Sequence, residues 1–493
     1  MPAKDFPSEL FLPFINQKSE LPQYVLLFRA FQQAILKGDL IPGAKLPASR
    51  PLSITLKVSR NTVKAAYETL QSEGYIETRH GSGSFVSEQL PRQSQRASNS
   101  IKPTLPSQTP PKLSAMTNRL LKFQNRHSST PGHLLAPAQC CIESFPWKQW
   151  QKQVTKAGRQ MKFALNTSEM GNNLLRDQIA NYLQVTRGVS CHAGQIMVCS
   201  GSQQALYLAF QILVDAGEKV WVEDPGYHGI SGAITSVGAV EVPVATDTDG
   251  FDLSSALKQA ADARVTVVTP SHNYPMGYTL SLERRLALID WAKQHSAWII
   301  EDDYDSEFRY DGPPLTALQG LGGEDCVIYA GTFTRILHPS IRLGYIVVPP
   351  ALVAPFAQAK RYIDGGISQL PQLALAEFMA SGQFSSHVRR MRKLYQYRRD
   401  LLNNAIVQAF GDKLRRVDSD GGMHSVFLLP SGYSDTEICQ ITDQYGLGIR
   451  ALSNYFSGEK SLQGLVMGFA GYNDEQINEG VSILKTQNPL LAD

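Results

Sequence analysis

Residues 89–112 constrain the fold of this chain more than any other segment, because they cannot contribute to a hydrophobic core. Their sequence, QLPRQSQRASNSIKPTLPSQTPPK, contains five prolines, several serines and glutamines and almost no large apolar residue. Such a composition is typical of a semi-extended linker. We therefore expect the 493 residues to fold as two units, residues 1–87 and residues 130–493, joined by a linker over residues 88–129.

The net charge of this chain, +3 at pH 7, conceals an uneven distribution. Residues 1–88 carry +2, residues 89–128 carry +7 and the remaining residues carry −6. A basic front joined to an acidic rear favours a polyanionic partner for the front only. The composition, 43% hydrophobic and 18% charged, is that of a globular protein and excludes a disordered, collagenous or coiled-coil chain.

Targeting signals and cysteine patterns favour a cytoplasmic location. The N-terminal sequence MPAKDFPSEL lacks a basic stretch followed by an apolar one, so we expect no secretory signal. No segment approaches the ~18 continuous apolar residues of a membrane span, so we expect no membrane partner. Six cysteines without a CxxC pair predict neither a disulfide framework nor a metal site. The adjacent Cys140 and Cys141 are expected to be buried thiols.

The front unit shows helical periodicity followed by a strand pattern. A first helix is expected to end at Gly38. Its apolar face consists of Tyr24, Leu27, Phe28, Phe31, Ile35 and Leu36. Ser49 is expected to cap a short helix around Leu52–Leu56. After a three-residue turn, Ser59 is expected to cap a second helix, which Gly74 ends.

The sequence IETRHGSGSFV predicts two short strands around a Gly-Ser-Gly turn, which completes the pattern of a winged helix-turn-helix. Residues 40–67 contain five basic residues and no acidic one, as contact with phosphates requires. The predicted DNA-binding residues are Arg50, Ser59, Arg60, Asn61, Thr62, Lys64, Arg79, His80 and Gly81. A helix with a merely solvated basic face is the alternative, but the hairpin and the acid-free segment together favour DNA.

The motifs LPASR, VSRNTV, AAYETLQSEGYI and RHGSGSFV, within residues 20–87, resemble the GntR-type DNA-binding domain. Lys57 stands where that family usually has a glycine in the turn. We therefore expect Lys57 to adopt a left-handed backbone conformation.

Strand and helix patterns alternate in the rear unit. Five apolar runs end in polar or glycine-rich turns: QIMVCSGSQQAL, KVWVEDPGYHG, VTVVTPSHNYPMG, AWIIEDDYDSEF and VIYAGTFTRILHPSIRLGYIVVP. This order predicts an α/β fold with a mostly parallel sheet covered by helices. Ligands of such sheets bind beyond the carboxyl ends of the strands, which is where the polar residues stand.

Several of these polar residues fit a flat, phosphorylated ligand. The sequence Ser200–Gln203 opens a helix and would offer backbone N–H groups to a phosphate. Tyr227 would lie over a ring, although a core or rim tyrosine is the alternative. Asn273 would bind a ring hydroxyl, and Asp302, at the end of an apolar strand, would pair with a pyridinium proton.

The rear motifs resemble the fold-type I, class I aminotransferase-like domain, and the whole chain resembles the MocR subfamily of GntR-type regulators. The phosphate contacts that this resemblance implies are Gly201, Ser202, Gln203, Thr332 and Arg342. The ring contacts that it implies are Tyr227, Asn273, Tyr304 and Asp302. It further implies pyridoxal 5′-phosphate or pyridoxamine 5′-phosphate as cofactor and a head-to-tail homodimer.

Arg335, in the sequence GTFTR, is the main departure from that family, which has a lysine there for the Schiff base. A guanidinium stays protonated and is a poor nucleophile, whereas Schiff-base formation needs a free amine. No lysine lies between Lys293 and Lys360 to replace it. We therefore predict no catalytic residue and no enzyme activity, and any cofactor would bind non-covalently, with Arg335 at the site.

A second departure concerns the carboxylate of an amino-acid ligand. Val466 stands where aminotransferases and some family members carry an arginine for it, and Arg450 lies nearby in sequence only. The contact to an effector carboxylate is therefore not assigned.

The sequence thus predicts a regulator that binds an operator in double-stranded DNA and senses a small molecule related to pyridoxal phosphate or to an amino acid. Two alternatives stay open. One is a working aminotransferase with an appended DNA-binding domain, which Arg335 disfavours. The other is a dimeric repressor without an effector.

Overall fold

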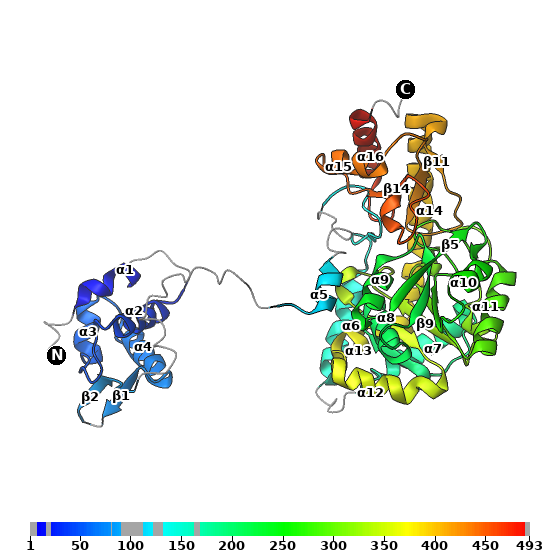
Figure 1. The fold of residues 1–493 in the computed structure, drawn as a ribbon. Helices are drawn as coiled ribbons and strands as arrows, with labels where there is room; N and C mark the ends of the chain where they lie inside the picture. Colours follow the sequence, from blue (N-terminus) through cyan, green and yellow to red (C-terminus); the bar gives the residue numbers. More distant parts are fainter. Residues whose placement is uncertain are drawn as a thin grey trace. The chain divides into compact units, whose positions relative to one another are not determined.

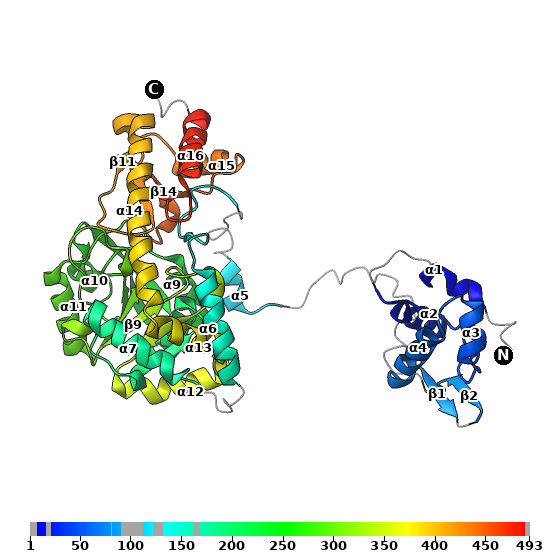
Figure 2. The same ribbon diagram turned by 180° about the vertical axis from the view of Figure 1, so that it is seen from behind.

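The computed structural model describes six stretches of the chain: residues 7–15, 21–79, 81–89, 112–121, 132–161 and 168–488. The chain divides into two compact units, Met1–Lys112 and Leu113–Asp493, and each is described here by itself (Figure 1, Figure 2). Most of the predicted linker falls outside the described residues.

The first unit is a small helical domain with a two-stranded wing. Its elements are η2 (Ser8–Leu10), α1 (Leu12–Ile15), α2 (Gln23–Lys37), α3 (Ser49–Thr55), α4 (Arg60–Ser72), β1 (Ile76–Arg79) and β2 (Gly83–Val86). The helices α2 and α4 pack together, and Phe31, Val63 and Leu70 are fully buried in their shared core. The strands β1 and β2 pair antiparallel, with Ile76 opposite Val86. The predicted winged helix-turn-helix is confirmed.

The cap of α4 agrees with its prediction, whereas the cap of α3 does not. Ser59 is the N-cap of α4, and its hydroxyl accepts a hydrogen bond from the Thr62 N–H at 3.0 Å. The prediction that Ser49 caps α3 is wrong, because Ala48 has the extended backbone of an N-cap and Ser49 is already helical. The Ser49 hydroxyl instead accepts a hydrogen bond from Arg60 Nε at 3.4 Å.

Two backbone predictions are confirmed and one core prediction is wrong. Gly38 ends α2 in a left-handed conformation, with φ 82°. Lys57 is left-handed in the turn between α3 and α4, with φ 52°. Tyr24 is 40% exposed in the first turn of α2, because the buried face of this helix runs through Leu27 and Phe31 and begins after it.

The second unit contains an eight-stranded sheet in the order β3-β10-β9-β8-β7-β4-β5-β6. Its strands are β3 (Ile196–Cys199), β4 (Lys219–Asp224), β5 (Val240–Asp247), β6 (Gly250–Phe251), β7 (Val265–Val268), β8 (Trp298–Asp303), β9 (Val327–Thr332) and β10 (Gly344–Val347). The strands β4, β5, β7, β8 and β9 pair parallel, whereas β10 runs antiparallel to β3 and β9, and β6 runs antiparallel to β5. The sheet is mostly parallel, as predicted.

Helices cover both faces of this sheet. Along β3, Ile196 and Val198 belong to one hydrophobic cluster, and Met197 and Cys199 belong to another. Successive side chains of a strand point to opposite faces, so both faces are packed. The helices around the sheet are α6 (Trp147–Gln160), α7 (Asn173–Arg187), α8 (Ser202–Leu213), α9 (His228–Val237), α10 (Leu253–Ala260), α11 (Leu282–His295), α12 (Val353–Ile363) and α13 (Gln369–Ala380).

A smaller C-terminal subdomain completes the second unit. The long helix α14 (Gln383–Phe410) leads from the large sheet to a four-stranded antiparallel sheet in the order β11-β12-β14-β13 (Figure 1). Its strands and helices are β11 (Arg415–Arg416), β12 (His424–Leu428), α15 (Asp435–Asp443), β13 (Arg450–Ala451), β14 (Gly464–Gly468) and α16 (Asp474–Gln487). The ligand pocket described below lies between this subdomain and the large sheet, because residues of both line it.

Three smaller features bear on the predictions. The short helix α5 (Ala115–Leu120) lies inside the predicted linker but packs against α9. Cys140 and Cys141 are buried free thiols, as predicted. Within the described residues, every helix is too short or too polar to cross a membrane.

Candidate functional site

The exposed start of α4 forms the candidate DNA-binding surface of the first unit. Arg60, Asn61 and Lys64 are exposed on its first turns, beside Ser59, and Thr62 is half-buried. Arg50 is exposed on α3. Among the described residues, none forms an ion pair with these cations, so their charges stay available for phosphates.

The wing presents a different environment. Arg79 Nη2 lies 2.5 Å from Glu77 Oε1 and 3.4 Å from Glu88 Oε1, and the guanidinium lies 4.8 Å from the centre of the Phe85 ring. Gly81 is exposed and left-handed, with φ 76°. The predicted contact His80 lies outside the described residues. Arg79 would therefore have to leave two carboxylates before it could bind a phosphate.

The predicted ligand residues of the second unit gather at the carboxyl ends of β3, β4, β8 and β9. Six of them line one cavity: Ser202, Tyr227, Asp302, Tyr304, Thr332 and Arg335. The other residues around this cavity are Ala138, Thr269, Tyr274, Met423 and His424. None of the residues that line it in the described part of the chain is a lysine, so the structure offers no amine in place of Arg335.

The predicted phosphate end surrounds the start of α8. Gly201 has φ 125° and stands at the N-cap, and no side chain caps the first N–H groups of this 12-residue helix. A Cβ at Gly201 would lie 3.8 Å from Arg342 Nη2 and 3.9 Å from Thr334 Oγ1. The Thr334 hydroxyl is buried and has no hydrogen bond within the described residues. Thr332 lies in the same turn, where its hydroxyl accepts the Thr334 N–H at 3.2 Å. These donors converge on a point that an anion would fill.

Asp302 supplies the negative charge of the pocket. It is 3% exposed near the end of β8, and among the described residues nothing donates a hydrogen bond to its Oδ1. Burial, together with the neighbouring Asp303, Glu223 and Asp305, raises the pKa of Asp302 to about 7, whereas Arg335 opposes the rise. A cationic N–H placed here would relieve both the burial and the repulsion.

Tyr227, at the N-cap of α9, lines the same pocket as Asp302. Its hydroxyl lies 3.4 Å from Gln203 Oε1, and Gln203 Nε2 donates to the Gly229 carbonyl at 2.8 Å. The ring of Tyr227 meets the ring of Tyr274 edge-on, with 6.0 Å between centroids. Gln203 therefore supports Tyr227 rather than lining the cavity itself.

Tyr304 and Asn273 occupy the side where a ring hydroxyl is predicted. Tyr304 OH lies 2.8 Å from His272 Nδ1, and His272 Nε2 lies 2.9 Å from Ser419 Oγ. Asn273 is 1% exposed, and its main-chain N–H donates to the Tyr278 carbonyl at 2.8 Å. The histidine link to the C-terminal subdomain was not predicted from the sequence.

Arg335 points into the cavity from the segment after β9. Its Nη1 donates a hydrogen bond to the Ala138 carbonyl, and its charge partly opposes the rise that burial causes in the pKa of Asp302 and of Asp305. The free space among the lining side chains is only about 60 Å³. Ligand pockets usually measure roughly 300–1,000 Å³, so side chains must move before a pyridine ring can enter.

Arg450 does not line the cavity itself but lies close to Tyr227 and Tyr274, which do, and sequence analysis could not place it there. It stands on β13 directly opposite Val466 on β14, the position where an arginine was sought. The neighbouring Tyr455, Tyr274 and Tyr227 raise the pKa of Arg450, while burial opposes the rise. No carboxylate among the described residues forms an ion pair with it. A motif search along one strand misses such a residue, because the register between two strands brings it to the site.

The chemistry of these residues fits a phosphorylated pyridine, although the cavity must widen to admit the ring and the amine for a covalent bond is missing. The start of α8, with Gly201, Thr334 and Arg342, fits the phosphate, and the buried oxygen of Asp302 fits a protonated ring nitrogen. Arg335 cannot form the Schiff base.

Comparisons with known proteins agree with both units. The family model "Bacterial regulatory proteins, gntR family" matches residues 24–86, and "Aminotransferase class I and II" matches residues 137–482. The chain is 34% identical over 475 residues to the "Probable rhizopine catabolism regulatory protein MocR" of Rhizobium meliloti, which covers 96% of this chain and 95% of the relative. The chain belongs to the MocR-type regulators of the GntR family. It is a helix-turn-helix transcriptional regulator that carries an aminotransferase-like domain.

Two further known proteins are similar to most of this MocR-type regulator. The "HTH-type pyridoxine biosynthesis transcriptional regulator PdxR" of Corynebacterium glutamicum is 31% identical over 456 residues, covering 92% of each chain. Among solved structures, a kynurenine aminotransferase of Pyrococcus horikoshii superimposes with a TM-score of 0.68 at 24% identity, covering 78% of this chain and 96% of the enzyme. This likeness concerns the fold alone.

Proposed function

We propose that this MocR-type regulator senses a phosphorylated pyridine, or an amino-acid adduct of one, that binds without a covalent bond. The observation that carries the proposal is that Asp302 and Arg335 line the same pocket without forming an ion pair. Asp302 keeps a buried carboxylate without a hydrogen bond on Oδ1, which costs stability unless a cation arrives. Arg335 takes the position of the amine that would form the covalent bond. The pocket therefore keeps residues that would recognise the ligand but lacks the amine that would attach it covalently.

The same arrangement argues against catalysis of amino transfer. A bound pyridoxal phosphate supplies an electron-withdrawing ring, but proton transfer beside the ring needs a base of suitable pKa. Arg335 stays protonated and cannot serve as that base. The side chains here would bind, orient and exclude water, which suits a receptor.

Arg335 and Arg450 define the chemistry of the effector beyond the ring. Among the described residues, neither guanidinium pairs with a carboxylate. A second anionic group on the ligand would compensate them, and guanidinium forks bind carboxylates in a bidentate manner. The preferred effector is thus a phosphorylated pyridine carrying a carboxylate, as in its adduct with an amino acid. The name of the relative PdxR, a regulator of pyridoxine biosynthesis, supports the pyridine part of this proposal.

The output of the sensor is operator binding by α4 and the wing. Helix-turn-helix regulators bind as dimers, with one half-site for each domain. A head-to-tail homodimer in the cytoplasm is the assembly we propose, because aminotransferase-like domains usually dimerise.

Calorimetry and absorption spectroscopy with pyridoxal phosphate, pyridoxamine phosphate and phosphopyridoxyl amino acids test the proposal. We expect binding of at least one compound and, for the adducts, tighter binding than for the parent compound. If none of them binds or changes the spectrum, the proposal is wrong. Mass spectrometry of ligand released from protein purified from cells would identify the natural effector.

Three further measurements separate the alternatives. Arg335→Lys is expected to gain an absorption band with pyridoxal phosphate that borohydride abolishes, which would show an intact pocket without its amine. Turnover of amino donors by the natural protein would favour the enzyme instead. Operator affinity that no vitamin B6 form or amino acid changes would favour a repressor without an effector.

A further inference from the structure

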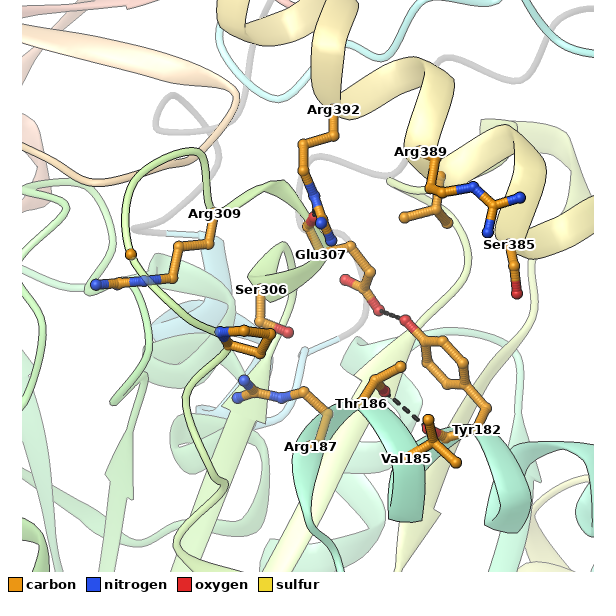
Figure 3. A pocket seen from close by; sticks show the side chains of 13 residues that line it. Tyr182, Val185, Thr186, Arg187, Ser306, Glu307, Arg309, Ser385, Arg389 and Arg392 are labelled. Atoms are coloured by element: carbon orange, nitrogen blue, oxygen red, sulfur yellow. Dashed lines mark hydrogen bonds between the residues drawn. The ribbon is translucent and has the colours of Figure 1, made fainter.

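A second cavity lies in the large domain and shares no lining residue with the pyridine pocket (Figure 3). Its volume is about 330 Å³, within the usual range of roughly 300–1,000 Å³ for ligand pockets. Three elements form its walls: the C-terminal half of α7, the segment 306–314 that follows β8, and the start of α14. This inference does not depend on the proposed function, because the two cavities are distinct.

One wall of this cavity carries an acid. Glu307 Oε1 accepts a hydrogen bond from Tyr182 OH at 2.8 Å, which holds the carboxyl group in place (Figure 3). No lysine or arginine of the described residues lies within 4.0 Å of this carboxylate. Burial raises the pKa of Glu307 to about 7, and the carboxylate forms no ion pair with a described residue. A ligand ammonium would supply a counter-ion.

The start of α14 adds two guanidinium groups to the lining of the cavity. Arg392 Nε donates to the main-chain carbonyl of Glu307 at 2.8 Å, which fixes Arg392 over the cavity (Figure 3). Arg389, one turn earlier on α14, donates to Ser386 Oγ at 3.2 Å and is exposed. Neither arginine forms an ion pair with a described residue. Both guanidinium groups can therefore bind the carboxylate of a ligand.

Two other arginines around the cavity are already engaged. Arg187 is 5% exposed and its Nε lies 2.8 Å from Asp303 Oδ2. Arg309 Nη2 lies 2.7 Å from Asp420 Oδ2, and its side chain points away from Glu307 in Figure 3. The charges left for a ligand are thus one carboxyl group and the two arginines of α14.

Apolar side chains complete the walls. Val388 is buried on α14, and Val185, on α7, is 85% exposed at the edge of the cavity. We infer that this cavity binds a free amino acid as its zwitterion. The ammonium group binds Glu307, the carboxylate binds Arg392, and the side chain packs against Val185 and Val388.

Calorimetry on the full chain with each of the twenty amino acids tests this inference. We expect at least one to bind, and we expect its N-acetyl and carboxamide derivatives to bind at least tenfold more weakly. Asp302→Asn, a change in the pyridine pocket, is expected to leave this binding intact. If no amino acid binds, or if Asp302→Asn abolishes the binding, the inference is wrong.

Variants at the cavity locate the binding. Val185→Trp fills the edge and is expected to weaken binding at least tenfold, whereas Leu174→Trp, at a 52% exposed position on the same helix, is the matched control. Equal binding by both variants, or a change of oligomeric state in Val185→Trp alone, would overturn the inference.

Charge variants identify the two ligand groups. Glu307→Gln keeps an acceptor for Tyr182 and is expected to lose the preference for the free amino acid over its N-acetyl derivative. Arg392→Gln is expected to lose the preference over the carboxamide. If each variant keeps the preference of the natural protein, the assignment of the two groups is wrong.

Discussion

The candidate DNA-binding surface and the candidate ligand pocket both carry charged side chains, but the charges are exposed to solvent at the first and buried in the second. Arg60 and Lys64 are exposed at the start of α4 and have no acidic partner among the described residues. In the pocket, Asp302 is buried beside Asp303 and Asp305 and faces Arg335. The first unit would bind a long polyanion at a solvated surface, where exposed charges have a small desolvation cost. The pocket would bind a small ligand through buried charges, and binding would reduce the free-energy cost of burying them.

Asp302→Asn should have the largest effect, because it removes the buried carboxylate that is placed to pair with a ring nitrogen. We expect the affinity for pyridoxamine phosphate to fall roughly 100-fold, as for truncation of one partner of a buried charge pair. Calorimetry measures this directly, and operator binding without ligand serves as the control. If the affinity of the variant stays within threefold of that of the natural protein, a difference on the order of ~0.6 kcal/mol, the buried charge of Asp302 does not contribute to ligand binding, and the contrast between the two regions is wrong.

Arg60→Ala should weaken operator binding by more than about tenfold, the scale of one lost base or phosphate contact. Arg96→Ala, in the basic linker, should only lower the salt sensitivity of binding. A gel-shift titration at two salt concentrations distinguishes the two effects. Equal losses from both changes would contradict the assignment of α4 as the recognition helix.

Asp302→Asn should also stabilise the protein without ligand, and more at pH 8 than at pH 5. Folding raises the pKa of Asp302 from 3.8 to about 7. The carboxyl group therefore hardly changes the free energy of unfolding below pH 3.8, and lowers it progressively as the pH rises to about 7. We expect a gain of roughly 1–3 kcal/mol in the free energy of unfolding at pH 8. Urea unfolding at both pH values measures it. A gain that is the same at both pH values would show that the charge of Asp302 is not its cause.

Ser59→Ala should have the smallest effect, about 1 kcal/mol lost from the stability of α4. Ser49→Ala is the control, because Ser49 is a half-buried serine of the neighbouring helix α3 that caps no helix. Hydrogen exchange of the α4 amides in the full chain compares the two variants. A larger loss from Ser49→Ala would mean that its contact with Arg60 matters more than the cap.

Much of the fold follows from local sequence signals. The amphipathic period of α2 and α4, the cap at Ser59 and the stop at Gly38 each act within one or two turns of helix. The alternation of apolar runs and helices likewise suffices for a mostly parallel sheet. The cap of α3 was mispredicted because a serine is also accommodated as the first helical residue, and only the backbone of Ala48 decides between them.

The ligand residues were predictable because each follows its own strand. Parallel strands bring their carboxyl ends to one edge, so Ser202, Asp302 and Thr332 meet although they are far apart in the chain. Arg450 was not predictable, because the register of β13 against β14 places it opposite Val466. The same holds for the link from Tyr304 through His272 to Ser419, which joins the large domain to the C-terminal subdomain.

The sequence by itself determined that this protein has a basic DNA-binding unit, an aminotransferase-like unit and no lysine at the position of Arg335. These properties depend on composition, local periodicity and the identity of one side chain. Only the tertiary structure decided that the pocket is nearly closed, that Asp302 is buried close to several other acids, and that Glu307 and the arginines of α14 line a second cavity. Burial and proximity arise from packing between distant segments, so no local pattern encodes them.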